Sequence, residues 1–152
     1  MRTLSRGVVH ACRAGYFQEA WKIFWEPKRS EYDHRPCHIF GQWSKDLEIL
    51  SRFFDKKYTE PVTDLDDRTK ALTLNEAGFD MRALGRLPQA QEPLQNGWKR
   101  AKAGEYWDLA AIAAGNMSKI KRALGKIVEA LDWATKSEHA NLYFEQRVED
   151  DV

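Results

Sequence analysis

The fold is decided by a phrase that occurs three times in the chain. It reads Ala14-Gly-Tyr-Phe-Gln-Glu-Ala, then Leu84-Gly-Arg-Leu-Pro-Gln-Ala, then Leu124-Gly-Lys-Ile-Val-Glu-Ala. Each copy has a glycine, an apolar residue two positions later and an alanine five positions later, and the last two glycines are 40 residues apart. A further step of 40 back from Gly85 reaches Lys45, where Leu47 keeps only the apolar position. The pattern indicates four units, the second of them degenerate.

The phrase is typical of two antiparallel helices joined by a tight turn. Glycine tolerates the left-handed backbone that ends the first helix. The apolar residue begins the core face of the second helix, and the alanine lies where the two helices cross closely. Sustained period-two alternation is missing from the sequence, so we expect no strands.

The helix boundaries follow from caps and prolines. Pro27 is expected to end the second helix, and Gly104 to stop the sixth. We expect helices at 3–14, 17–26, 37–42, 45–57, 66–84, 88–103, 106–124, 127–137 and 140–149. The repeat units are then about 1–28, 37–58, 64–104 and 105–138 of one domain, with 139–152 beginning a further unit or forming a capping helix.

Composition narrows the function classes. Lys and Arg number 24 against 23 Asp and Glu, and this balance does not favour nucleic-acid binding. No apolar run is long enough to span a membrane or to serve as a signal peptide. The two cysteines, Cys12 and Cys37, are too few for a disulfide-stapled secreted domain. We therefore expect a cytoplasmic protein with reduced thiols and no cofactor.

The middle unit resembles the tetratricopeptide (TPR) repeat family position by position. The matching residues are Leu74, Ala77, Gly78, Met81, Gly85, Leu87, Ala90 and Leu94. The spacing of 40 exceeds the usual repeat length of about 34, which implies longer helices. The resemblance implies an all-α, right-handed α-solenoid of antiparallel hairpins that binds a protein or peptide and is not an enzyme.

A narrower resemblance is to the TPR sensor regions of bacterial signalling proteins of the STAND type. It rests on the order of four segments, namely 46–54, 74–79, 84–93 and 110–118. In such proteins the repeats follow a nucleotide-binding switch domain. This chain has no Walker-type phosphate-binding phrase, so the resemblance implies a sensor segment or a free-standing relative.

The resemblance also predicts a ligand groove. In such solenoids the first helix of each hairpin lines the concave face, and the residues expected there are Arg13, Asn75, Phe79, Arg82, Lys119 and Arg122. Its basic side chains suit an acidic peptide or a terminal carboxylate. The alternative is a solvated polar face.

Three other readings stay open. Asp33-His-Arg-Pro-Cys-His contains possible metal ligands, but it lacks the paired spacing of a zinc site. Six tryptophans fill the spaces between lengthened helices or line a ligand surface. Exposed solenoid ends are apolar and favour self-association into a homo-oligomer, a structural role that rivals ligand binding.

Overall fold

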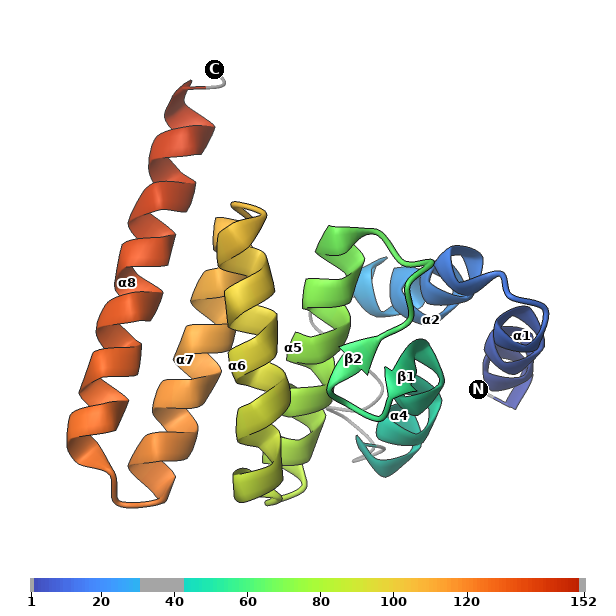
Figure 1. The fold of residues 1–152 in the computed structure, drawn as a ribbon, viewed down its shortest axis with the longest axis horizontal. Helices are drawn as coiled ribbons and strands as arrows, with labels where there is room; N and C mark the ends of the chain where they lie inside the picture. The colour runs from blue at the N-terminus through green and yellow to red at the C-terminus, as the bar shows by residue number, and fades with distance from the viewer. Residues whose placement is uncertain (1, 31–42, 151–152) are drawn as a thin grey trace. The chain divides into compact units, whose positions relative to one another are not determined.

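A computed structural model describes residues 2–30 and 43–150 of this chain. The chain divides into two compact units, Met1–Asp66 and Asp67–Val152, called here the N-terminal and the C-terminal unit (Figure 1). The described residues are mostly helical, which confirms the all-α prediction at this level. None of the helices in these residues is long and apolar enough to cross a membrane.

The N-terminal unit begins with a helical hairpin and ends with a short β-ribbon. Its elements are α1 (Arg2–Arg13), α2 (Phe17–Ser30), α4 (Trp43–Leu50), the 3-10 turn η1 (Ser51–Phe53), β1 (Phe54–Lys56) and β2 (Glu60–Pro61). Aromatic rings form much of its core. The Trp21 ring meets the Phe53 ring edge-on at 5.3 Å between centroids, and the Phe24 ring lies 6.0 Å from Phe53. These contacts join α2 to the segment that follows α4.

Two predictions for residues 45–61 are wrong. The predicted helix over 45–57 ends at Leu50, and β1 pairs with β2 as an antiparallel ribbon. The ribbon is too short for alternation to reveal it, and its turn uses Tyr58 at φ 62° rather than glycine or asparagine. The Tyr58 hydroxyl donates to the Leu47 carbonyl (2.9 Å), which ties the turn back to α4. The predicted helix over 37–42 lies outside the described residues.

Pro27 does not end the second helix, because α2 continues to Ser30. Pro93 likewise lies inside α6. A proline removes one hydrogen bond and crowds the preceding turn, but its fixed φ is close to the helical value. Both helices therefore continue past the proline, with one backbone carbonyl left without its usual partner.

The C-terminal unit consists of four successive antiparallel helices. They are α5 (Asp67–Ala83), α6 (Leu87–Ala103), α7 (Trp107–Ala123) and α8 (Ile127–Asp150). Each helix packs on the next, and α5 also contacts α7 (Figure 1). The first three agree with the predicted boundaries to within one residue at each end. Their order produces two neighbouring hairpins, α5–α6 and α7–α8.

The separate helix predicted over 140–149 is wrong, because α8 runs without a break to Asp150. Ser137 is the residue at which a new helix could have been capped. Its hydroxyl instead donates to the Ala111 carbonyl of α7 (2.9 Å). With no glycine or proline after Gly125, nothing interrupts the helix, and α8 extends past the start of α7 (Figure 1).

The turns of the three phrase copies share one geometry. Gly15, Gly85 and Gly125 have φ of 81°, 74° and 75°, in the left-handed region. In each turn the residue after the glycine donates its N–H back to a carbonyl five residues earlier, as Arg86 does to Met81 (2.9 Å). This confirms the predicted role of the glycines in ending the first helix of each hairpin.

The two hairpins of the C-terminal unit also repeat their helix crossings 40 residues apart. In the first hairpin a Cβ added at Gly78 would clash with Leu94 and lie 3.2 Å from the Ala90 carbonyl oxygen. At the equivalent place in the second hairpin, the Ser118 hydroxyl donates to the Ala130 carbonyl (2.8 Å). Ala90 is fully buried and Ala130 is 6% exposed. The small residues of the phrase therefore lie at the closest approach of each pair, as predicted.

Candidate protein-binding surface

The structure places Asn75 in the interior, and not on the open face that the sequence analysis expects. Its side chain is 2% exposed, and its Nδ2 donates to the Leu109 carbonyl of α7 (2.9 Å). On the other side it lies against Gly97 of α6, whose missing side chain makes room for the amide. Asn75 therefore joins three helices of the C-terminal unit, and we remove it from the candidate surface.

Phe79 and Arg82 lie together near the end of α5. The Arg82 guanidinium lies over the Phe79 ring, 5.2 Å from its centroid. Both side chains are half-buried, and burial lowers the pKa of Arg82 from its usual range. Among the described residues, the buried Nε of Arg82 has no hydrogen-bond partner. Arg82 is thus a packed residue as well as a charged one.

Lys119 and Arg122 occupy the equivalent positions of α7, 40 residues after Phe79 and Arg82. Both are exposed. Because α5 and α7 are in contact and their hairpins share the same crossings, the four residues lie on corresponding faces of neighbouring helices. We call Phe79, Arg82, Lys119 and Arg122 the basic face.

The cations of the basic face are not neutralised within the described part of the chain. No ion pair there involves Arg82, Lys119 or Arg122. Nearby, Glu129 is shared by Lys121 (2.6 Å) and Lys126 (3.4 Å). The hydrogen bond from Lys121, helped by Lys126, lowers the pKa of Glu129. One carboxylate therefore serves two lysines, and this end of the unit keeps a positive excess.

Arg13, the remaining predicted site residue, lies in the N-terminal unit. It is exposed in the last turn of α1 and is not placed relative to the basic face. Its neighbour Cys12 is half-buried, and burial raises the pKa of this thiol although the charge of Arg52 opposes the shift. A raised pKa leaves little thiolate at neutral pH, so Cys12 offers a poor nucleophile.

All six tryptophans are buried or half-buried. Trp21 and Trp133 are buried, whereas Trp25, Trp43, Trp98 and Trp107 are half-buried. Trp98 of α6 meets Trp133 of α8 edge-on at 5.3 Å, and the Lys136 ammonium lies 4.4 Å from the Trp133 ring centroid. Trp107 stacks on Tyr143 at 4.8 Å. These contacts agree with the interpretation that tryptophans fill the spaces between helices.

An ion pair that the sequence analysis missed joins the first turns of α5 and α7. Arg68 donates from both terminal nitrogens to Asp108, with Nη1–Oδ1 at 3.1 Å. Desolvation acts to raise the pKa of Asp108, but the hydrogen bond and the charge of Arg68 outweigh it and lower that pKa. The two residues are 40 apart, so the repeat period itself was the signal that could have found the pair.

A larger omission concerns the outer side of α8. Ile127 was expected to begin the core face of the second helix, yet it is 63% exposed, and Val128 and Leu131 beside it are 85% and 69% exposed. Their spacing does lie on one helical face, but it is the face turned away from α7. Periodicity identifies a face and does not say whether a neighbouring helix covers it.

The possible metal ligands of residues 33–38 lie outside the described residues. Within the described residues no group of three or more His, Cys, Asp or Glu side chains is arranged to hold a metal ion.

No known protein family, curated protein or solved structure significantly matches this chain. The candidate surface therefore rests on geometry and charge alone.

Proposed function

We propose that this chain is a protein-binding scaffold that holds an acidic peptide against the basic face of α5 and α7. The observation that carries the proposal is the repetition of the face. An arginine recurs at the matching position of two neighbouring helices, as Arg82 and Arg122. Lys119 adds a further cation, and no described carboxylate pairs with these three side chains. Charge-assisted contacts with carboxylates are the interactions that such a surface provides.

A competing explanation for these cations is local. Arg82 and Arg122 lie in the last turns of α5 and α7, where positive charge offsets the negative end of the helix dipole. That role would account for the arginines but not for Lys119, which lies one turn earlier, nor for the aromatic ring beside Arg82. Phe79 supplies the apolar contact that peptide recognition surfaces combine with charge.

The test uses the exposed half of the basic face, because Arg82 is packed on Phe79 and its loss could disturb the fold. A fluorescent glutamate-rich peptide is titrated with the full chain, and anisotropy is recorded. We expect binding that weakens as salt rises and that weakens about tenfold or more in Lys119→Ala/Arg122→Ala. The matched control is Lys99→Ala/Arg100→Ala on α6, which changes the same charges at exposed positions.

Equal affinities for the two double variants would remove the basic face from consideration. A neutral peptide of the same length provides the second comparison. If it binds as well as the glutamate-rich peptide, recognition is not electrostatic and the ligand class is wrong.

We also propose that the scaffold serves as the sensor segment of a bacterial signalling protein. The support is the resemblance of its repeat phrases to TPR sensor regions. Occupation of the basic face would then be reported to an attached switch domain. Fusion of the chain to its native neighbours, followed by measurement of peptide-dependent nucleotide hydrolysis, tests this role, and hydrolysis that ignores the peptide would contradict it.

A further inference from the structure

The side of α7 that carries the basic face also carries an exposed apolar residue. The exposed residues of α7 are Ile112, Lys119, Arg122 and Ala123. Since successive residues of a helix are about 100° apart, these side chains all lie within about 100° of one another around the axis. α7 is therefore most open along one strip, and Ile112, at 54% exposed, belongs to it.

The same strip recurs on α5, 40 residues earlier. After the first turn of α5, the residues that are not buried are Leu72, Phe79, Arg82 and Ala83. Each of them is the repeat counterpart of one exposed residue of α7, and the counterpart of Ile112 is Leu72. We call the two rows together the open strip. Both helices place an apolar residue in their first half and an arginine in their last turn.

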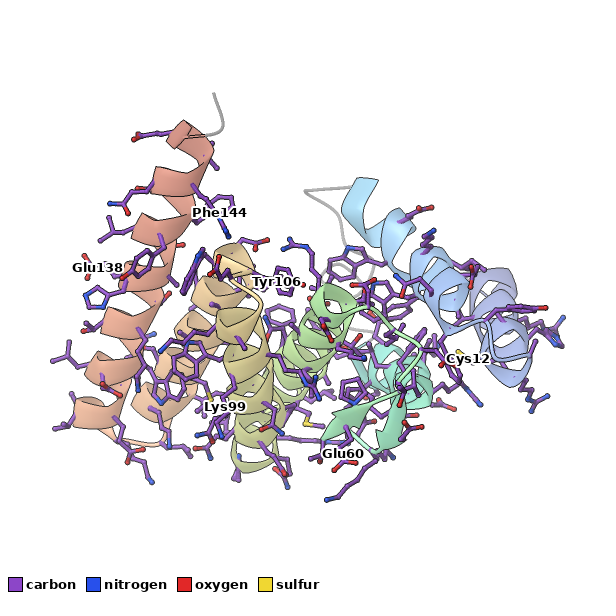
Figure 2. The ribbon with its side chains drawn as sticks, turned by 45° about the horizontal axis from the view of Figure 1, so that its top comes forward. Cys12, Glu60, Lys99, Tyr106, Glu138 and Phe144 are labelled. Atoms are coloured by element: carbon purple, nitrogen blue, oxygen red, sulfur yellow. The ribbon has the colours of Figure 1, made fainter. Side chains whose placement is uncertain are left out.

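Unpaired positive charge is confined to one end of the open strip. At the other end, where α5 and α7 begin, Arg68 pairs with Asp108. Lys70 pairs there with Asp67 (3.7 Å). Tyr106, whose ring centroid lies 5.5 Å from Arg68 Cζ, marks this end of the unit in Figure 2. This end is therefore neutral, and the cations without a described ion pair lie in the basic face.

The distance between the apolar and the cationic end follows from helix geometry. Ile112 and Arg122 are ten residues apart on one helix, which corresponds to about 15 Å along its axis. Leu72 and Arg82 have the same separation in sequence. An extended peptide rises about 3.3 Å per residue, so about four or five of its residues span this distance. A ligand that reaches both ends carries its apolar and its acidic groups that far apart.

We propose that the acidic peptide held by the basic face also carries an apolar side chain, about four or five residues from its carboxylates, which packs on Leu72 and Ile112. This inference rests on the proposed function and specifies its ligand. Charge complementarity directs the acidic end of the peptide to Lys119 and Arg122. The neutral end offers apolar contact, and covering Ile112 removes apolar surface from water. The apolar side chain therefore adds affinity that does not depend on charge.

The test compares two fluorescent peptides by anisotropy with the full chain. One peptide has a leucine separated by four serines from three glutamates, and the other has serine in place of the leucine. We expect the wild type to bind the leucine peptide about five- to tenfold more tightly. Both affinities should fall as salt rises. In Ile112→Ser the advantage of the leucine peptide should largely disappear, whereas the serine peptide should bind as tightly as before.

Ile127→Ser is the matched control, because Ile127 is also exposed, at 63%, but lies on α8 outside the open strip. This variant should keep the full advantage of the leucine peptide. A third peptide, in which the leucine is directly attached to the glutamates, tests the spacing and should bind no better than the serine peptide. Circular dichroism of each variant verifies that the helices persist.

The outcomes distinguish this inference from the proposed function. If Lys119→Ala/Arg122→Ala binds both peptides as tightly as the wild type, the proposed function fails and the inference fails with it. If that double variant weakens both peptides but the wild type does not prefer leucine, the basic face binds the ligand and the inference alone is overturned. Equal loss of the leucine advantage in Ile112→Ser and Ile127→Ser would also overturn it, as would a preference for leucine that ignores the spacing.

Discussion

At the scale of single residues, the glycines inside the helices do different work from those in the turns. Gly78 has no room for a side chain, because an added Cβ would clash with Leu94. Gly115 has room, because its added Cβ would lie at an ordinary 3.4 Å from Ser137 Oγ. Both are helical glycines of the C-terminal unit, so they form a matched pair.

We expect Gly78→Ala to destabilise the protein by about 1–3 kcal/mol through overpacking. Gly115→Ala should instead stabilise it by about 0.5–1 kcal/mol, because alanine has the higher helix propensity. Urea unfolding of both variants gives the comparison. A gain of stability in Gly78→Ala would mean that α5 and α6 are further apart than described.

Glu105 offers a second residue-level prediction. It has φ 55° although it is not glycine, and its carboxylate pairs with Arg147 (2.6 Å) at an exposed site. Glu105→Ala loses the pair and keeps the left-handed strain, whereas Glu105→Gly loses the pair and removes the strain. Glu105→Gly should therefore be more stable than Glu105→Ala by about 1 kcal/mol. Identical melting temperatures for the two variants would contradict this.

The sequence predicted the residues of the hairpin turns and crossings well, and the exposed site residues only partly. Gly85 and Ala90 have the roles that their residue types imply, because a positive φ and a close crossing each admit few alternatives. Asn75 was misplaced because helical spacing alone puts it on an open face. Its burial depends on Leu109 and Gly97, which belong to other helices and cannot be read from the α5 sequence.

At the scale of elements, the pair between Arg68 and Asp108 links α5 to α7 and depends on pH. Because the folded-state pKa of Asp108 is lowered, the pair contributes fully above the unfolded value of about 3.9. Its contribution is lost as the pH falls through the lowered pKa. Both side chains are partly exposed, so its size is limited by solvent screening.

A double-mutant cycle with Arg68→Ala and Asp108→Ala should give a coupling free energy of about 0.2–1 kcal/mol at pH 7. The coupling should shrink at a pH low enough to protonate Asp108. A second double-mutant cycle, with Lys136→Ala and Asp132→Ala, gives the coupling free energy of an ion pair within one helix, since these residues pair in α8 at 2.6 Å. The coupling between α5 and α7 is compared with that value. Coupling that stays constant on acidification would show that the carboxylate charge is not involved.

Element boundaries were predictable where turns have a strong signature and were missed where packing decides. The turns around Gly85 and Gly125 were located correctly. The end of α8 was not, because Ser137 has two possible hydrogen-bond roles and only the neighbouring α7 selects one. The β-ribbon was missed because a tyrosine occupies its left-handed turn position.

At the scale of the whole molecule, burial varies strongly along the C-terminal unit. Thr73, Leu74 and Ala77 of α5 have no exposed surface, whereas every residue from Asn141 to Glu149 is exposed. Local opening should therefore begin at the end of α8. We expect amides of 141–149 to exchange hydrogen faster than those of α5 at low micromolar protein, as measured by mass spectrometry. Equal protection of both segments would contradict the described packing.

The two hairpins must also avoid pairing with each other's helices during folding. The shared repeat gives α5 and α7 similar faces, so each could pack against the wrong second helix. Where α5 crosses α6, the larger residue, Asn75, is on α5 and faces Gly97 of α6. Where α7 crosses α8, the order is reversed, because Gly115 is on α7 and faces Ser137 of α8. Exchanging α6 and α8 would push Ser137 into Asn75 and leave two glycines facing a void. A mispaired arrangement would therefore be destabilised by a steric clash at one crossing and by a cavity at the other. The positions of the two glycines thus select the correct partner for each helix.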